Sequence, residues 1–170
     1  MHKLLFTGGT CFIGSNILKN IQLNHKVYVI QKKESKKVIL KSKNIQIIKF
    51  NNYNYLSSKL KKIKVDAVIH CATHYKKIHN TSDLKKFAES NILLGNIILE
   101  NIKNMGAKKF INFTTPEVYG DNKKVLNEET LFNPSTPYAL SRVSADIHMK
   151  LMNKYKKFPI IFTQIGRAHV

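Results

Sequence analysis

The most constraining feature of this sequence is a glycine turn near its start, Thr7-Gly8-Gly9-Thr10-Cys11-Phe12-Ile13-Gly14. The turn follows the apolar run Lys3–Phe6 and precedes a helix-like run from Ser15 to Ile21. A strand, a glycine turn and a helix in this order are typical of the start of a βαβ unit that binds a dinucleotide. The turn lets backbone N–H groups approach a pyrophosphate, and the helix N-terminus adds the positive end of its dipole.

Short apolar runs then alternate with helix-like runs along the chain. We expect strands at Lys3–Thr7, Lys26–Ile30, Asn44–Phe50, Asp66–His70, Lys109–Thr114 and Pro159–Thr163, and helices at Phe12–Ile21, Ser82–Asn104 and Tyr138–Tyr155. The polar segment Asn51–Asn54 is expected to be a turn, and Gly106 ends the long helix. This alternation predicts an α/β fold, a Rossmann-type doubly wound parallel sheet. Residues 1–164 would form this single domain.

The composition places the chain among globular proteins. With 170 residues, of which 43% are hydrophobic, it can bury a sizeable core. No apolar run approaches the roughly 18–20 residues that cross a bilayer, and the start, Met1-His2-Lys3, lacks the apolar core of a signal peptide. Two isolated cysteines, Cys11 and Cys71, indicate neither a disulfide framework nor a zinc site. We therefore expect a cytoplasmic protein with no membrane partner.

The net charge of +19 has two explanations. Lysines occur along the whole sequence, whereas the only arginines are Arg142 and Arg167, as an A/T-rich genome would encode. A selected positive field would instead attract anions such as sugar nucleotides or nucleic acid. No regular aromatic interleaving accompanies the lysines, so we expect no nucleic-acid partner. A basic nucleic-acid-binding protein remains the rival, and purely electrostatic binding of that kind would fall steeply with salt.

The residues after the second predicted strand bear on cofactor choice. Gln31, Lys32 and Lys33 stand there, with no carboxylate before Glu34. An acidic residue at this place would bind the ribose hydroxyls of NAD, and a basic one would accommodate the 2′-phosphate of NADP. The sequence thus favours NADP over NAD, unless the two lysines merely belong to the general lysine excess.

Candidate catalytic residues follow the fifth predicted strand and open the last helix. The segment Thr114–Gly120 lies at the carboxyl edge, where α/β sheets bind ligands. Tyr138 and Arg142 stand one helical turn apart on the same face. A cation beside a phenol lowers its pKa toward that of a general base, and the Thr115 hydroxyl could hydrogen-bond the substrate oxygen.

With these motifs in this order, the sequence resembles the extended short-chain dehydrogenase/reductases, which include sugar-nucleotide epimerases and 4,6-dehydratases. The similarity extends to Gln164 and rests on Thr7–Gly14, Asp66–Thr73, Asn91, Thr114–Asp121 and Pro137–Asp146. The resemblance implies NAD or NADP as cofactor and a nucleotide sugar as substrate. It also implies a homodimer formed through the long helix and the helix of Tyr138.

The resemblance implies residue roles as well. Tyr138 would take the proton of a sugar hydroxyl while hydride passes to NAD(P)⁺, which gives a keto-sugar; Thr115 would assist, and Arg142 would stand where a lysine binds the nicotinamide ribose. The expected catalytic residues are Thr115, Glu117, Tyr138 and Arg142. The expected cofactor-binding residues are Gly8, Thr10, Cys11, Phe12, Ile13, Gly14, Gln31, Lys32, Asn51, Ala72, Thr73, Asn91, Tyr138 and Arg142.

Three positions depart from the family pattern. Cys11 replaces the middle glycine of the turn. Three interpretations are open: the small side chain is tolerated, it weakens cofactor binding, or it supplies a reactive thiol. Arg142 replaces a lysine. Pro116 replaces the aspartate of the Asp-Glu pair that serves dehydratases, and it has no proton to give, which favours an epimerase or reductase over a dehydratase. The alternative is a non-catalytic NAD(P)-binding protein of the same fold.

His70, His74 and His79 are close in sequence but lack the partners of a metal site, so no metal is expected and His70 is interpreted as a packing residue. The final segment, residues 165–170, equals the translation of a common sequencing-adapter stretch. We expect the native sequence to end at Gln164 and the C-terminal substrate domain of the family to be missing. Such a fragment would be inactive alone.

Overall fold

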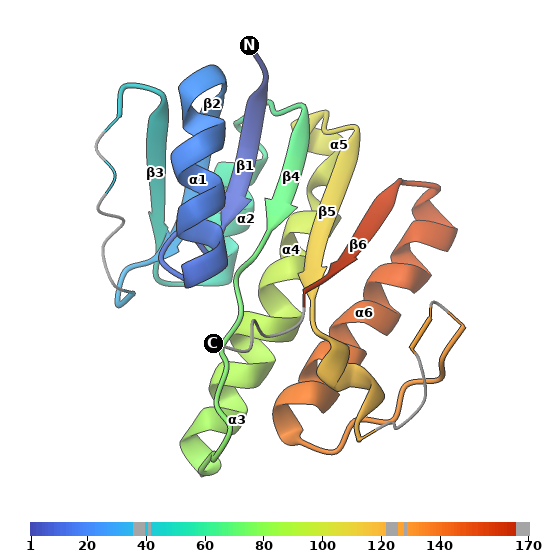
Figure 1. Cartoon of the computed structure of the whole chain (residues 1–170). Coiled ribbons are helices and arrows are strands. Elements are labelled where there is room, and N and C mark those ends of the chain that lie inside the picture. The colour runs from blue at the N-terminus through green and yellow to red at the C-terminus, as the bar shows by residue number, and fades with distance from the viewer. Residues whose placement is uncertain (36–39, 41, 122–125, 128, 166–170) are drawn as a thin grey trace.

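Six parallel strands form one sheet in the computed structural model, which describes residues 1–35, 40, 42–121, 126–127 and 129–165. The strands are β1 (Lys3–Thr7), β2 (Lys26–Lys32), β3 (Ile45–Phe50), β4 (Ala67–His70), β5 (Lys109–Thr114) and β6 (Ile160–Gln164). Their order is β3-β2-β1-β4-β5-β6 (Figure 1). This is the doubly wound Rossmann order, so the predicted fold class is confirmed.

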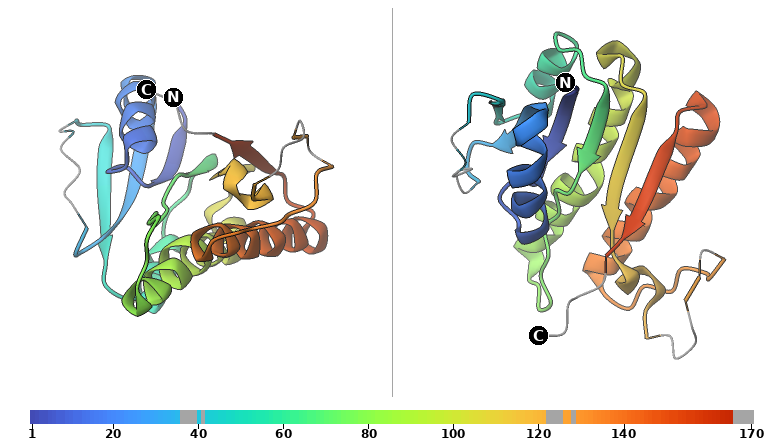
Figure 2. Two further views of the ribbon diagram at one scale, coloured as in Figure 1. Left: turned by 60° about the horizontal axis from the view of Figure 1, so that its bottom comes forward. Right: turned by 45° about the horizontal axis from the view of Figure 1, so that its top comes forward.

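The helices lie on both faces of this sheet. They are α1 (Phe12–Asn24), α2 (Tyr53–Leu60), α3 (Thr81–Phe87), the π-helix η1 (Ala88–Leu93), α4 (Leu94–Glu100), α5 (Ile102–Met105), the 3₁₀-helix η2 (Pro116–Tyr119) and α6 (Pro137–Lys156). Helix α1 covers one face, while α2, α4 and α6 cover the other (Figure 2). The strand order reverses between β1 and β4, and a crevice for ligands is expected at the carboxyl ends there.

The core has two layers because side chains alternate along a strand. In β1, Leu5 packs toward the face of α2, α4 and α6, whereas Leu4 and Phe6 pack toward α1 with Leu18. All four are buried. The strands therefore read as nearly continuous apolar runs, as expected for a parallel sheet covered on both sides.

Two elements differ from the sequence-based expectation. The segment predicted to be a polar turn instead starts helix α2, because the side chain of Asn52 caps it by accepting a hydrogen bond from the Tyr55 N–H at 2.8 Å. The long predicted helix is divided by the π-helical segment η1 and by a break at Asn101. The predicted artefact segment lies outside the described residues from position 166 onward.

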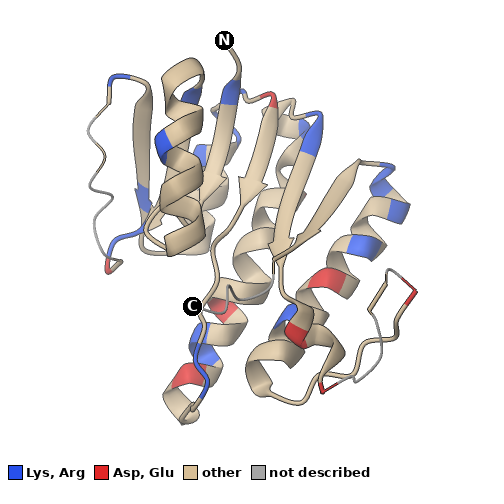
Figure 3. Ribbon diagram, in the orientation of Figure 1, with Lys and Arg blue, Asp and Glu red and all other residues tan. Residues whose placement is uncertain are grey.

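Lysine and arginine are distributed over several helices and both ends of the sheet rather than gathered on one element (Figure 3). Within the described ranges, the helices are too short or too polar to cross a bilayer.

Candidate active site

The glycine turn is packed so tightly that side chains are excluded at two positions. Gly8 has a φ of +79°, and a Cβ there would lie 2.6 Å from the carbonyl carbon of Cys71. A Cβ on Gly14 would overlap the Gly8 carbonyl oxygen. These two glycines therefore let β1 and α1 approach the end of β4, which is the role such glycines have in dinucleotide-binding turns.

Cys11 fits this turn as the N-cap of α1. Its Sγ accepts a hydrogen bond from the Gly14 N–H at 3.2 Å, and its own N–H donates to the Gly8 carbonyl at 3.0 Å. A thiol thus takes the capping role that a hydroxyl or carboxylate usually has. In the described part of the chain, the N–H groups of Phe12 and Ile13 meet no acceptor. They are the groups that an anion at a helix N-terminus would use.

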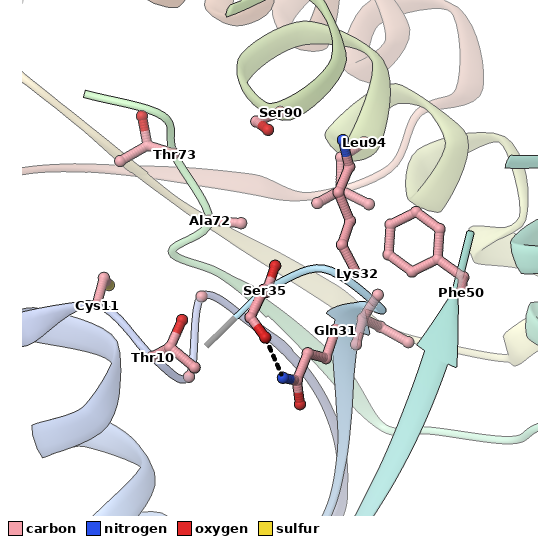
Figure 4. Close-up of a pocket in the computed structure, with 13 residues that line it drawn as sticks. Thr10, Cys11, Gln31, Lys32, Ser35, Phe50, Ala72, Thr73, Ser90 and Leu94 are labelled. Atoms are coloured by element: carbon pink, nitrogen blue, oxygen red, sulfur yellow. Dashed lines mark hydrogen bonds between the residues drawn. The ribbon is translucent and has the colours of Figure 1, made fainter. Parts of the chain in front are cut away.

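A pocket of about 130 Å³ opens at the carboxyl ends of β1, β2 and β4 (Figure 4). Its lining includes seven of the predicted cofactor residues, Gly8, Thr10, Cys11, Gln31, Lys32, Ala72 and Thr73. It also includes six that the sequence reasoning missed, Gly9, Ile30, Ser35, Phe50, Ser90 and Leu94. Gly9, Ile30, Phe50 and Ser90 lie next to a predicted residue, so proximity in the sequence was the available signal for them; Ser35 and Leu94 carried no such signal.

Asn91 and Asn51 lie elsewhere. Asn91 is fully buried, and its side chain accepts hydrogen bonds from the His74 N–H and the Thr73 hydroxyl and donates to the His74 carbonyl and to Ser141 Oγ. Two acceptor and two donor sites are thereby used, so Asn91 fastens the loop after β4 to α6 rather than facing the pocket. Asn51 is exposed after β3 and does not line the pocket.

The predicted catalytic residues are brought together at the same edge of the sheet. Tyr138 is buried near the start of α6, with its ring edge-on to Tyr75 at a centroid distance of 4.8 Å. Burial raises the pKa of Tyr138, while the charge of Arg142 and hydrogen bonding with the Thr73 and Thr115 side chains act in the opposite direction. The expectation that Arg142 would bring the pKa below its usual value is corrected, because desolvation outweighs the cation.

Arg142 is buried and half satisfied. Its Nη2 donates to the carbonyl oxygen of Phe113 at 2.6 Å, whereas its Nη1 is buried and has no acceptor among the described residues. A buried donor without a partner is costly unless a ligand or water completes it. Arg142 therefore ties α6 to the end of β5, while the two N–H groups of its Nη1 have no partner among the described residues.

His70 is neutral and packed into the core of this region. Its Nδ1 lies 2.8 Å from the Thr7 hydroxyl, which also accepts from the Ala72 N–H. Burial, with a smaller effect of Arg142, lowers the pKa of His70 to about 3. The packing interpretation of His70 thus agrees with its surroundings, and His74 pairs with Asp83 instead, at 3.2 Å. The described residues contain no cluster of metal-ligating side chains.

Thr115 and Glu117 begin the 3₁₀-helix η2 next to Tyr138. Thr115 caps η2 by accepting from the Glu117 N–H at 3.3 Å. Burial raises the pKa of Glu117, and the charge of Lys77 lowers it in part. Glu117 therefore holds its proton more readily than an exposed glutamate does, and it lies near the Tyr138 phenol. The neighbouring Pro116 has no proton to give.

The strand order defines the chain as a Rossmann-type domain with a pocket at the carboxyl ends of its strands. It belongs to the NAD dependent epimerase/dehydratase family, whose model matches residues 4–167. It is 33% identical to a dTDP-D-glucose 4,6-dehydratase of Dictyostelium discoideum over 99% of this chain and 44% of that protein. The chain spans about half the length of the curated relatives it matches.

Solved structures give the same result for the fold. The UDP-N-acetylglucosamine 4-epimerase of Methanobrevibacter ruminantium superposes with a TM-score of 0.83 and 26% identity, over 95% of this chain and 53% of that one. The UDP-glucuronic acid 4-epimerase of Bacillus cereus, solved with NAD, gives 0.80 and 25%, over 96% and 56%.

Proposed function

We propose that the protein is an enzyme that uses a nicotinamide dinucleotide to oxidise a hydroxyl-bearing carbon of a nucleotide-activated sugar to a ketone. The observation that carries this proposal is the placement of Tyr138, Thr115 and Arg142 at the sheet edge that also holds the glycine turn. The relatives support it, because those named above are nucleotide-sugar 4-epimerases and a 4,6-dehydratase.

The residues fit the dinucleotide. Gly8 and Gly14 allow the tight packing of the turn, and the N–H groups of Phe12 and Ile13 that follow it have no acceptor within the described ranges and can bind a pyrophosphate. Arg142 stands where the family resemblance places the residue that binds the nicotinamide ribose, and its buried Nη1 has no acceptor among the described residues. When bound, the nicotinamide supplies the hydride acceptor.

The chain's own groups handle the proton. The phenolate of Tyr138 takes the proton of the sugar hydroxyl as the carbonyl forms, and Thr115 hydrogen-bonds the same oxygen. Because burial raises the pKa of Tyr138, the ionised form gains population as pH rises, so turnover should increase toward alkaline pH. Glu117 is the carboxyl group that could exchange a proton with the keto-sugar beside it.

The choice between reactions follows from Pro116. Without the aspartate at this position a dehydratase lacks one of its two acids, which favours epimerisation or reduction. Glu117 keeps elimination of water as a second candidate, because burial raises its pKa and so favours its protonated form, and the Dictyostelium relative is a 4,6-dehydratase. Product analysis separates the two, since only elimination yields a deoxy-sugar.

The test uses the protein translated from the complete reading frame at the source locus, incubated with NAD⁺ and either dTDP-glucose or UDP-N-acetylglucosamine. Keto-sugar formation should fall by about 100-fold or more in Tyr138→Phe, because general-base catalysis contributes about that much. Tyr55→Phe, an exposed tyrosine on α2 that does not line the pocket, is the matched control. Undiminished turnover by the Tyr138→Phe variant would show that Tyr138 is not the general base. Binding of NADH without turnover of either sugar nucleotide would instead indicate the non-catalytic alternative.

A further inference from the structure

Lys32, on which the sequence preference for NADP rests, is already paired with carboxylates. Its Nζ lies 2.7 Å from Glu89 Oε2 and 3.9 Å from Glu34 Oε1. The Lys32 side chain is only 19% exposed, and Figure 4 shows it extending from the end of β2 toward the helix that carries Ser90 and Leu94. The lysine at the edge of the pocket is therefore bound by a carboxylate from another part of the fold.

The structure holds Glu89 in this position from two sides. The backbone carbonyl of Glu89 accepts a hydrogen bond from the Tyr53 hydroxyl at 2.8 Å, and the Lys32 ammonium lies 5.8 Å from the centre of the Tyr53 ring. Glu89 itself belongs to the π-helix η1, whose wider turn changes which side chains face β2. The exposed Lys85 lies 3.8 Å from the other carboxylate oxygen.

Both members of the pair are charged at neutral pH. Burial alone would lower the pKa of Lys32, but the hydrogen bond from its ammonium to Glu89 and the nearby Tyr53 raise it overall. The hydrogen bond with Lys32 lowers the pKa of Glu89. The lysine thus contributes almost no net positive charge to the pocket. Lys33 is exposed and does not line it.

Resting on the proposed function, we propose that Glu89 is a specificity-determining residue that makes the adenosine end of the pocket select NAD over NADP. A 2′-phosphate carries a charge of about −1.5 to −2, and Lys32, the cation in the pocket lining that would pair with it, is already held by Glu89 at 2.7 Å. A ribose 2′-hydroxyl is neutral and needs no such cation. Glu89 does not itself line the pocket, so it acts on the bound nucleotide through Lys32.

The test compares the affinities of the 170-residue chain for NADH and for NADPH. Binding is measured by the fluorescence of the reduced nicotinamide. The wild-type chain should bind NADH at least about tenfold more tightly, a difference of about 1.4 kcal/mol. Glu89→Gln keeps the backbone carbonyl that Tyr53 contacts and frees the Lys32 charge, so it should raise NADPH affinity by about tenfold. The double variant Lys32→Ala/Glu89→Gln should lose that gain.

Glu100→Gln is the matched control, because Glu100 also pairs with a lysine, Lys156 at 2.9 Å, but this lysine, unlike Lys32, does not line the pocket. An unchanged NADPH-to-NADH ratio in Glu89→Gln, or a wild-type chain that binds NADPH as tightly as NADH, would overturn the role of Glu89 and leave the proposed function standing. A chain that binds neither nucleotide would overturn the proposed function and this inference together.

Discussion

At the scale of single residues, the crevice depends on glycine at position 8. The positive φ strains any side chain, and a Cβ would also collide with the backbone of Cys71. We predict that Gly8→Ala lowers the free energy of unfolding by about 3 kcal/mol or more. Gly106 also has a positive φ but open space around it, so Gly106→Ala should cost only about 1 kcal/mol. Urea unfolding measures both; equal losses would show that packing at Gly8 contributes nothing.

His70 should make the fold sensitive to acid. In the unfolded chain a histidine titrates near 6.5, whereas burial lowers the folded pKa of His70 to about 3. Between about pH 6.5 and pH 3 this histidine is protonated in the unfolded state but not in the folded state. The free energy of unfolding therefore falls as pH falls. The contribution is about 1.4 kcal/mol per pH unit, or about 2 kcal/mol between pH 6.5 and pH 5. His70→Gln should remove this part of the slope; superimposable pH profiles of the two proteins would refute it.

At the scale of elements, Asn91 joins η1, the loop after β4 and α6. Its removal leaves several buried partners unsatisfied, so Asn91→Ala should cost about 2–4 kcal/mol and speed hydrogen exchange at the His74 N–H. Asn96 lies on the same helical stretch, and its Oδ1 has no partner among the described residues. Asn96→Ala should therefore cost less than about 1 kcal/mol. Similar losses for the two variants would contradict the role of Asn91.

Elements were predictable where one periodicity dominates. The bounds of β1 and β5 match the expectation at both ends, because short apolar runs between turn residues have few alternatives. Helix α2 was missed because the cap at Asn52 competes with the turn that the same asparagines favour. The π-helix was missed because one extra residue in a turn leaves no clear mark on the periodicity.

The candidate site was also predictable only in part. The glycine turn and Tyr138 could be located from sequence because their positions follow from strand ends and helix starts. The partner of Lys32 could not, since Glu89 is distant in the chain and reaches Lys32 only through the π-helix. The pKa of Tyr138 also required the structure, because the balance of burial against the Arg142 charge depends on three-dimensional packing.

At the scale of the whole molecule, α6 presents an apolar stripe to solvent. Leu140, Ile147, Leu151 and Tyr155 are exposed at helical spacing. Helix α6 lies beside α4 on one face (Figure 2), and we propose that a second copy of the chain covers it. Analytical ultracentrifugation should give twice the 19.6 kDa chain mass, and Ile147→Glu should return the monomer mass. Leu23→Glu, an exposed leucine on α1, should not. A wild-type monomer at every concentration would exclude this dimer.

The most direct test of the account is a titration of the isotopically labelled 170-residue chain with NAD⁺, followed by the backbone amide resonances. Binding at the crevice should move the amides of Phe12 and Ile13 first, together with those of Gln31 and Ala72, because these line or adjoin the pocket. Amides on the opposite edge of the sheet should stay still. Unmoved resonances at the glycine turn, or shifts confined to another surface, would contradict the claim that this chain is a nicotinamide-dinucleotide-binding domain.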